Sequence, residues 1–217
     1  MGEAGSSAGR ALTHEAIARG LADYGIEASA GQIAQIQKYI ALLLQWNEKV
    51  NITSLQDPRE ILFRHFCESM FGAVAGPVER GRLADVGSGG GFPGLPIKIL
   101  VPDLQVILIE SNTKKAAFLA EVARQLGVAG VRVMVERYEE LGEELAPLDY
   151  VCSRALGDFE QFLGWAASPA TAVRTVMLWI GAADVERAKQ ANGWEWREVL
   201  AIPHSMRRYL LIGDRRK

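Results

Sequence analysis

The glycine-rich segment from Asp85 to Gly94 constrains the fold of this chain more than any other feature of the sequence. Glycines let a backbone turn sharply from a strand into a helix, and they let a ligand approach the main chain closely. The helix after such a turn points free N–H groups and the positive end of its dipole toward the ligand. The segment therefore predicts a strand, a ligand-binding turn and a helix, which together open an α/β sheet.

Strands and helices are expected to alternate from residue 82 onward. This alternation implies a parallel sheet with right-handed crossovers. The predicted strands are Leu83–Gly87, Gln105–Glu110, Val131–Val135, Tyr150–Ser153 and Thr175–Ile180, and the predicted helices lie between them at about 93–100, 112–126, 157–167 and 182–191.

The chain is expected to end in two antiparallel strands. Glu195–Ala201 and Arg207–Gly213 are joined by the short connection Ile202–Ser205, which leaves no room for a crossover helix. A dinucleotide-binding domain more often continues with parallel units. Five parallel strands followed by an antiparallel hairpin predict the doubly wound, Rossmann-like α/β fold of class I methyltransferases.

The first third of the chain predicts helices that precede the sheet. A short helix is expected at Thr13–Tyr24. Ser29 and Gln32 form a capping-box pattern at the start of a second helix. Asp57-Pro58 opens a third helix with an N-cap and a proline at the first helical position, and this helix is expected to end near Gly72.

Length and composition fit one α/β core with a modest appendage. We expect a disordered tail over residues 1–10, a helical extension over 11–78 and the sheet-bearing core over 79–217, with the boundary near Gly76-Pro77. The formal net charge of -2 argues against a strongly basic nucleic-acid binder, although it leaves room for a local basic patch. No apolar run approaches the roughly 18 residues that a membrane span needs.

The two cysteines, Cys67 and Cys152, are far apart in the sequence and form no CxxC pair. They predict neither a disulfide framework nor a zinc cage, and they fit a reducing cytoplasm. The sequence leaves the oligomeric state open, with a monomer favoured.

The glycines fit two cofactor patterns. Gly89-x-Gly91-x-x-Gly94 satisfies the dinucleotide fingerprint, whereas Asp85 two residues before Gly87 matches the methyltransferase pattern of an acid followed by GxGxG. Phe92-Pro93 also makes a bulkier start to the helix than a pyrophosphate usually needs. Together with the terminal hairpin, these details favour S-adenosylmethionine over a nicotinamide cofactor. The candidate cofactor-binding residues in this segment are Asp85, Gly87, Gly89, Gly91 and Phe92.

Polar residues after the later strands complete the expected cofactor site. Glu110, with Ser111 beside it, ends the second strand, where a carboxylate can accept hydrogen bonds from both ribose hydroxyls; the alternative is a solvated carboxylate. Tyr138 and Glu139 follow the third strand and are placed to meet the adenine amino group; the alternative is an ordinary helix cap. Arg154 follows the fourth strand, which should neighbour the first. It would hold the methionine carboxylate or an RNA phosphate, unless it is a surface arginine without a role.

Several separate segments of the chain match one protein family. They are Trp46-Asn47, Asn51–Ser54, Arg64–Ser69, Asp85–Ile97, Glu110, Lys114-Lys115, Phe118-Leu119, Arg137–Glu140 and Ser153–Ala155. From about residue 30 onward the chain thus resembles the glucose-inhibited division protein B family, which methylates N7 of a guanine in bacterial small-subunit (16S) ribosomal RNA. The GFPGLP extension of the loop and the NIT and RH segments make this resemblance far more specific than the glycines alone.

The resemblance implies an S-adenosylmethionine-dependent rRNA (guanine-N7) methyltransferase that acts on ribosomal RNA or a small-subunit precursor. It places the cofactor contacts at Gly87, Phe92, the Tyr138-Glu139 pair and Arg154, with Glu110 at the ribose. The chain departs from the family pattern at Ile180, where relatives usually carry a lysine before the glycine that ends the fifth strand. If that lysine meets RNA phosphate in relatives, another residue must do so here.

Methylation at guanine N7 makes few chemical demands on an enzyme. N7 carries a lone pair at neutral pH and the cofactor sulfur leaves as a neutral thioether, so alignment and a dry pocket are the main requirements. We therefore expect no catalytic general base, no metal and no covalent intermediate. The candidate RNA contacts are Arg64, His65, Arg137, Arg207 and Arg208, each of which could instead be a solvated or packing side chain.

Two other functions stay open at this stage. A small-molecule methyltransferase would share every cofactor residue and would use the N-terminal helices as a lid. A non-catalytic cofactor-binding module would keep the fold without the transfer.

Overall fold

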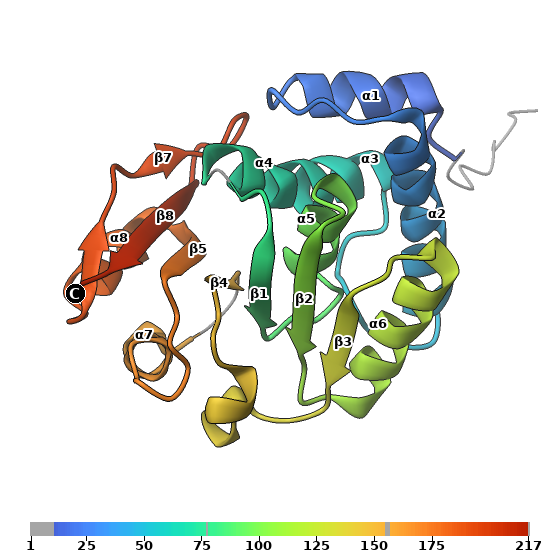
Figure 1. Ribbon diagram of the computed structural model, residues 1–217. Helices are drawn as coiled ribbons and strands as arrows, with labels where there is room; N and C mark the ends of the chain where they lie inside the picture. The colour runs from blue at the N-terminus through green and yellow to red at the C-terminus, as the bar shows by residue number, and fades with distance from the viewer. Residues whose placement is uncertain (1–10, 77, 155–156, 217) are drawn as a thin grey trace, which may run out of the picture.

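The computed structural model describes residues 11–76, 78–154 and 157–216, so the tail expected at 1–10 lies outside the described residues. Within these ranges a central sheet is flanked by helices (Figure 1). Its strands are β1 (Gly81–Val86), β2 (Leu104–Ile109), β3 (Val131–Met134), β4 (Tyr150–Ser153), β5 (Thr175–Gly181), β6 (Trp194–Trp196), β7 (Leu200–Ala201) and β8 (Arg208–Arg215).

The strands follow the order β3-β2-β1-β4-β5-β8-β6 across the sheet, and β7 also pairs with β8. The strands β1 to β5 run parallel, whereas β8 lies antiparallel between β5 and β6. Because β1 lies between β2 and β4, the winding direction reverses there and the carboxyl ends of β1 and β4 border a crevice. These pairings confirm the predicted parallel sheet and its antiparallel end. They also confirm that β4 lies beside β1.

Local capping signals start the helices of the first third as predicted. The Ser29 hydroxyl accepts from the N–H of Gln32, and the Gln32 side chain accepts from the N–H of Ser29, so the capping box is present. Asp57 caps the third helix through the N–H groups of Arg59 and Glu60. The helical segments are α1 (His14–Ala22), α2 (Ala30–Asn47), α3 (Pro58–Ile61), η1 (Leu62–Cys67), α4 (Glu68–Ala75), α5 (Gly94–Leu100), α6 (Thr113–Leu126), η2 (Tyr138–Glu140), η3 (Glu143–Leu145), α7 (Phe159–Ala166) and α8 (Ala182–Lys189).

The third predicted helix is longer and less regular than expected. The prediction that it ends near Gly72 is wrong, because the helix continues to Ala75. Gly72 is a packing glycine: a Cβ there would overlap the ring of Trp179 in β5. In addition, the segment η1 is π-helical, a widened turn that is frequent at functional sites.

The first strand of the predicted terminal hairpin is interrupted. The expected single strand over Glu195–Ala201 is wrong, because β6 and β7 pair with β8 on either side of a bulge. The chain advances four positions from Trp196 to Leu200 but three positions between their partners, Gly213 and Leu210, so one residue is extra. The Trp196 ring lies over Gly213, where an added Cβ would be 2.7 Å from it.

Alternate residues of the strands point into two hydrophobic cores. Leu83 and Leu108 belong to the first core, which holds the apolar side chains of α1, α2, α4, α5 and α6. Ala84 and Ile107 belong to the second core, which lies under α7 and α8. Both faces of the sheet are therefore covered, as the doubly wound fold requires. The first core spans the boundary expected near residue 78, and Figure 1 shows α2 of the helical extension beside α6.

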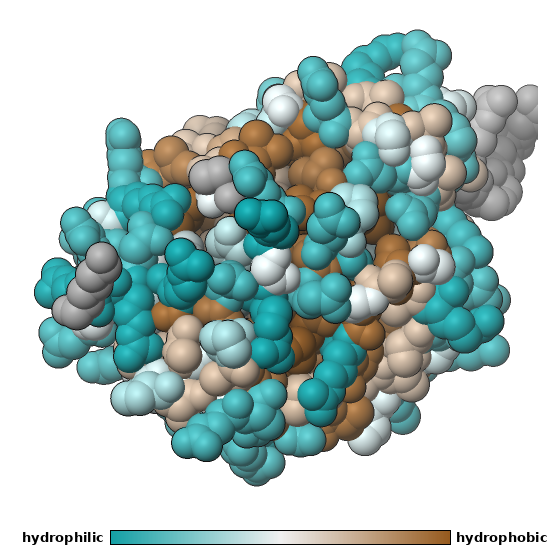
Figure 2. Space-filling view, viewed as in Figure 1, coloured by the Kyte–Doolittle hydropathy of each residue, from teal (hydrophilic) through white to brown (hydrophobic). Residues whose placement is uncertain are grey.

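Polar residues cover most of the face shown in Figure 2, and apolar residues gather around α4, where Val74 is half exposed. In the described ranges, no helix is long and apolar enough to cross a membrane. The same ranges hold no group of three His, Cys, Asp or Glu side chains suited to a metal ion.

Candidate functional site

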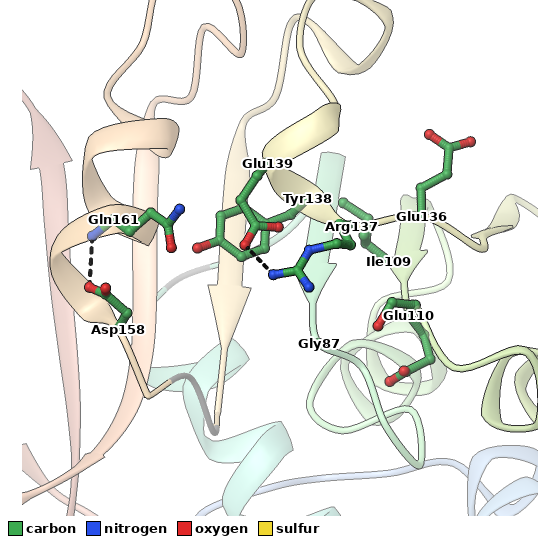
Figure 3. Close-up of a pocket in the computed structure, with 10 residues that line it drawn as sticks. Gly87, Ile109, Glu110, Glu136, Arg137, Tyr138, Glu139, Asp158 and Gln161 are labelled. Atoms are coloured by element: carbon green, nitrogen blue, oxygen red, sulfur yellow. Dashed lines mark hydrogen bonds and ion pairs between the residues drawn. The ribbon is translucent and has the colours of Figure 1, made fainter.

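A cavity of about 320 Å³ opens at the carboxyl ends of β1, β2 and β3 (Figure 3). Ligands of doubly wound sheets bind at this edge. The walls come from the connections after β1, β2 and β3 and from the start of α7. The lining residues are Gly87, Ile109, Glu110, Ser111, Glu136, Arg137, Tyr138, Glu139, Asp158 and Gln161.

Gly87 begins the loop and lines the cavity, whereas the predicted cofactor residue Gly89 is not among the lining residues. Gly87 and Gly89 have φ values of +71° and +56°, a left-handed conformation that L side chains rarely adopt. A Cβ added at Gly87 would have no described residue within 4 Å apart from the two neighbours of Gly87 in the chain. A ligand can therefore approach the backbone of Gly87. Gly89 donates its N–H to Glu110 Oε2 over 2.8 Å. This half of the loop has the open backbone that its glycines predict.

Glu110 lies at the end of β2 and is 8% exposed. Its Oε2 accepts from the Gly89 N–H and its Oε1 from the Asn112 N–H, each over 2.8 Å. These contacts contradict the alternative of a solvated carboxylate. A carboxylate offers about four acceptor positions, so Glu110 can hold the loop and still accept hydrogen bonds from a ribose.

The connection after β3 supplies another wall of the cavity. Tyr138 packs edge-on against Phe162 and Trp165, with ring centroids 5.9 and 5.2 Å apart. Arg137, a candidate RNA contact, lines the cavity and pairs with Glu139 over 3.1 Å. The Arg137 side chain makes no capping hydrogen bond to η2, so the segment is not an ordinary side-chain cap.

Asp158 and Gln161 line the cavity from the start of α7 and were not predicted. Asp158 Oδ1 accepts from the Gln161 N–H over 3.0 Å and thereby caps the helix. The signal was present in the sequence, because Asp158 stands at the predicted start of the helix that follows the fourth parallel strand, and such helix starts lie near the carboxyl edge of the sheet.

Asp85 does not line the cavity. It is fully buried beneath the loop, where its Oδ2 accepts from the Gly94 N–H over 2.9 Å. Burial raises the pKa of Asp85 to about 7. A Cβ at Gly94 would lie 2.8 Å from the Asp85 Cβ, so the strand and the helix start are packed tightly together. The structure places Asp85 where it fixes the shape of the loop.

Gly91 and Phe92 lie on the other side of the loop, against the helical extension, and do not line the cavity either. Phe92 is buried and stacks on His65 with ring centroids 4.4 Å apart. A Cβ at Gly91 would overlap the hydroxyl oxygen of Tyr39 in α2. These two predicted cofactor residues therefore contact the helical extension and not the cavity.

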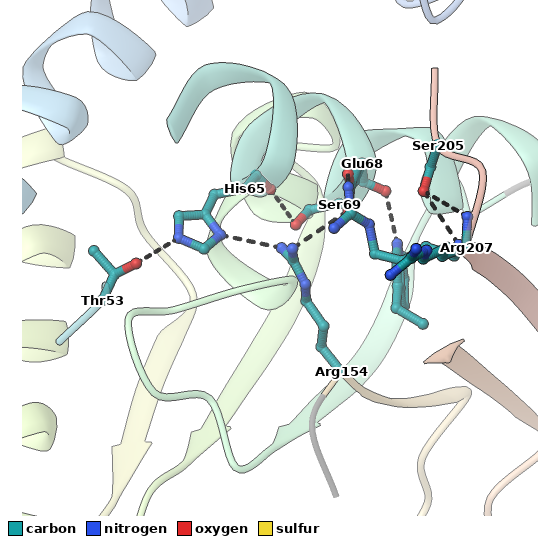
Figure 4. A network of polar contacts seen from close by, with 9 residues as sticks. Thr53, His65, Glu68, Ser69, Arg154, Ser205 and Arg207 are labelled. Atoms are coloured by element: carbon teal, nitrogen blue, oxygen red, sulfur yellow. Dashed lines mark hydrogen bonds and ion pairs between the residues drawn. The ribbon is translucent and has the colours of Figure 1, made fainter. Parts of the chain in front are cut away.

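A chain of polar contacts joins η1 to the ends of β4 and β8 (Figure 4). Arg154 Nη1 donates to His65 Nδ1 over 3.3 Å, and Arg154 Nη2 pairs with Glu68 Oε2 over 3.3 Å. Arg208 pairs with the other oxygen of Glu68 over 2.5 Å. His65 Nε2 lies 2.9 Å from the Thr53 hydroxyl. Two predicted site residues, Arg154 and Arg208, thus meet through Glu68, which was not singled out as a site residue, and His65 joins them through Arg154.

Burial and the neighbouring charges determine the protonation of the side chains in this network. Burial, reinforced by the neighbouring Arg154 guanidinium, lowers the pKa of His65 to about 3, so the ring is neutral. Arginine cannot accept a hydrogen bond, so Nδ1 is the acceptor and Nε2–H donates to Thr53. Burial raises the pKa of Glu68, while Arg154 and Arg208 oppose that rise.

The remaining candidates for RNA contact lie around the network. Arg64 and Arg207 are exposed, and Arg208 is half-buried. Ile180, the position at which the sequence predicts a departure from the family pattern, is buried in the second core. The next residue in β5, Gly181, pairs with Arg208, so this arginine lies beside the altered position.

Comparisons with known proteins agree with this arrangement. Residues 32–206 match a family model described as rRNA small subunit methyltransferase G. The ribosomal RNA small subunit methyltransferase G of Xylella fastidiosa (strain M23) is 44% identical over 137 residues, which span 62% of this chain and 63% of that relative, slightly less than two thirds. The protein of the same name from Pseudomonas syringae pv. syringae (strain B728a) is 38% identical over 149 residues, 69% of this chain and 68% of the relative.

Solved structures share the fold. A SAM-dependent methyltransferase from Aquifex aeolicus superposes with a TM-score of 0.57 at 16% identity, over 75% of this chain and 96% of that chain. At this identity the likeness shows the fold alone, and it confirms the predicted Rossmann-like methyltransferase architecture.

Proposed function

The chain belongs to the rRNA small subunit methyltransferase G family, and we propose from this that it transfers a methyl group from S-adenosylmethionine to N7 of a guanine in small-subunit ribosomal RNA. The family resemblance inferred from the sequence is confirmed. In this proposal the partner is ribosomal RNA or a small-subunit precursor, and the reaction takes place in the cytoplasm.

The observation that carries the proposal is the position of the cavity relative to the arginine network. The cavity lies at the ends of β1 to β3, and Arg154 follows β4, which pairs with β1. A cofactor in the cavity and a nucleotide at the network would therefore meet at the crevice between β1 and β4. Methyl transfer requires this kind of alignment.

The residues of the cavity fit S-adenosylmethionine. The open backbone at Gly87 leaves space that a Cβ would fill, and Glu110 retains acceptor positions suited to ribose hydroxyls. Tyr138 and Glu139 offer a ring and a carboxylate for the adenine. When bound, the cofactor supplies a methyl group on a cationic sulfur.

On the substrate side, the network supplies cations for the RNA backbone. Glu68 pairs with both Arg154 and Arg208, so this pair of arginines keeps a net positive charge. The exposed Arg64 and Arg207 add to this positive charge, and guanidinium groups at the surface can bind phosphate oxygens. If a lysine at the position of Ile180 meets RNA phosphate in relatives, Arg208 is the candidate for that contact here, because it pairs with the neighbouring Gly181.

His65 is suited to shape the substrate pocket without taking a proton. Its ring is neutral and its Nδ1 already accepts from Arg154. Guanine N7 attacks through a lone pair that needs no deprotonation, so a base is not required. His65 stacks on the buried Phe92, which fixes the plane of the His65 ring beside the network.

The decisive experiment compares ribosomal RNA from a strain lacking this gene with RNA from its parent. N7-methylguanine becomes a cleavage site after borohydride and aniline treatment, so the deletion strain should lose one site. Purified protein with S-adenosylmethionine should restore that site on small subunits from the deletion strain.

Two variants make the assay specific. Arg154→Ala should abolish restoration while the protein stays folded, whereas Glu140→Ala, at an exposed carboxylate outside the cavity, should restore the site as wild type does. If RNA from the deletion strain keeps every N7-methylguanine, the RNA assignment is wrong and a small-molecule substrate replaces it.

A further inference from the structure

The glycine loop is anchored from outside the sheet by one residue of the helical extension. Tyr39 lies in α2 and is fully buried. Its hydroxyl donates to the carbonyl oxygen of Gly90 over 2.5 Å. Burial raises the pKa of Tyr39 well above its ordinary value, so the hydroxyl keeps its proton and remains a donor.

Aromatic stacking fastens the same part of the loop. The Tyr39 ring lies nearly parallel to Phe92, with centroids 5.5 Å apart and 11° between the planes. On its other side Phe92 stacks on His65, with centroids 4.4 Å apart and 15° between the planes. Phe92 is thus held between two side chains that both come from the N-terminal helices.

The two halves of the loop have different neighbours. Gly91, with φ of +87°, has no room for a Cβ, because the Tyr39 hydroxyl, its nearest neighbour, and then Leu95 Cδ1 crowd that space. Gly89, with φ of +56°, would place a Cβ no closer than 3.8 Å to its nearest neighbour, the Gly87 carbonyl oxygen. The glycine at 91 therefore serves the contact with Tyr39, whereas no described residue of the helical extension lies within 4 Å of a Cβ at 89.

We propose that Tyr39 is a positioning residue for the cofactor site, because its hydrogen bond to Gly90 holds the loop so that Gly87 faces the cavity. Glycines have the largest conformational freedom of all residues, so a run of them needs anchors on both sides. Glu110 provides one anchor at the Gly89 N–H, and Tyr39 provides the other at the next residue. This inference rests on the proposed binding of S-adenosylmethionine.

The test starts with Tyr39→Phe, which removes only the hydroxyl, and with the matched control Tyr24→Phe. Tyr24 is also a buried tyrosine of the extension, but it packs on Phe63 and His204. Calorimetric titration with S-adenosylmethionine and with S-adenosylhomocysteine should give a dissociation constant about fivefold to tenfold higher for Tyr39→Phe, the scale of ordering one backbone residue. Tyr24→Phe should bind as wild type does, and thermal melts should show both variants folded.

A double-mutant cycle separates positioning from general support of the fold. Gly91→Ala should weaken cofactor binding less in the Tyr39→Phe background than in wild type, because the clash with the hydroxyl is gone. Gly89→Ala, also at a positive φ but away from Tyr39, should carry the same penalty in both backgrounds.

The outcomes distinguish this inference from the proposed function. Wild type that binds neither ligand would overturn the proposed cofactor. Wild type that binds, with Tyr39→Phe binding equally well, would overturn the role of Tyr39 and leave the cofactor assignment standing. If Gly91→Ala does not fold, the comparison of Tyr39→Phe with Tyr24→Phe still decides.

Discussion

Acidification should weaken the folded state through His65, by an amount that the structure lets us work out. The pKa of the folded ring is lowered to about 3, mainly by burial and then by Arg154, from an ordinary value of 6.5. Between about pH 7.5 and 5.5 the unfolded chain takes up most of a proton at this ring, whereas the folded chain takes up almost none. Unfolding thereby becomes easier by about 1.4 kcal/mol as the pH falls across this window. The stabilising contribution is complete above the unfolded pKa and declines as the pH falls toward 3.

The size of this effect does not depend on the folded pKa, as long as that pKa lies well below 5.5. Asp85 opposes it, because its pKa is raised to about 7 and protonation of the folded state there favours folding over the same window. A comparison of wild type with His65→Gln cancels the contribution of Asp85. Glutamine can accept from Arg154 and donate to Thr53 without titrating.

Urea denaturation at both pH values measures the required difference. The stability advantage of wild type over His65→Gln should shrink by about 1.4 kcal/mol between pH 7.5 and 5.5. If the free energies of unfolding of the two proteins change equally across this window, His65 has an ordinary pKa in the folded state. The interpretation of His65 as a neutral ring bound to Arg154 would then be wrong.

Three further outcomes follow from single contacts. Glu110→Ala should weaken S-adenosylmethionine binding by about 1.5–3 kcal/mol in calorimetry, and an unchanged affinity would mean that the carboxylate only holds Gly89. Glu68→Ala leaves Arg154 and Arg208 without their shared partner and should lower the free energy of unfolding by about 3–5 kcal/mol in urea; a loss below 1 kcal/mol would show that both arginines reach water instead. Gly72→Ala should destabilise the fold by about 1–3 kcal/mol, because its methyl group overlaps the Trp179 ring, and a simultaneous Trp179→Phe should recover part of that loss in thermal melts.

The features that the sequence predicted well depend on nearby residues. The Ser29–Gln32 capping box forms within one turn, and Asp57 caps the residues directly after it. The parallel strands are short segments rich in aliphatic residues, and β4 was predicted with its observed bounds. The placement of Glu110 at the cavity followed from the rule that ligands meet parallel strands at their carboxyl ends.

The features that the sequence could not predict depend on residues that are far apart. Glu68 meets Arg154 across 86 positions and Arg208 across 140 positions, and no local pattern encodes such a pairing. A glycine in a helix suggests the end of the helix, but Gly72 is required because the Trp179 ring packs against its backbone. The interruption between β6 and β7 likewise depends on how Trp196 packs over Gly213 in β8.

The loop from Gly87 to Gly94 shows why a glycine pattern alone is a weak guide to a cofactor. Gly87 lies open to the cavity, whereas Gly91 is required by Tyr39 and Gly94 by Asp85. The same spacing therefore combines one ligand-facing position with two that serve packing against a helix and a strand. We therefore expect substitutions at Gly91 and Gly94 to act on cofactor binding through the shape of the loop. In our proposal, the helical extension contributes to the cofactor site through Tyr39, which holds the loop without lining the cavity.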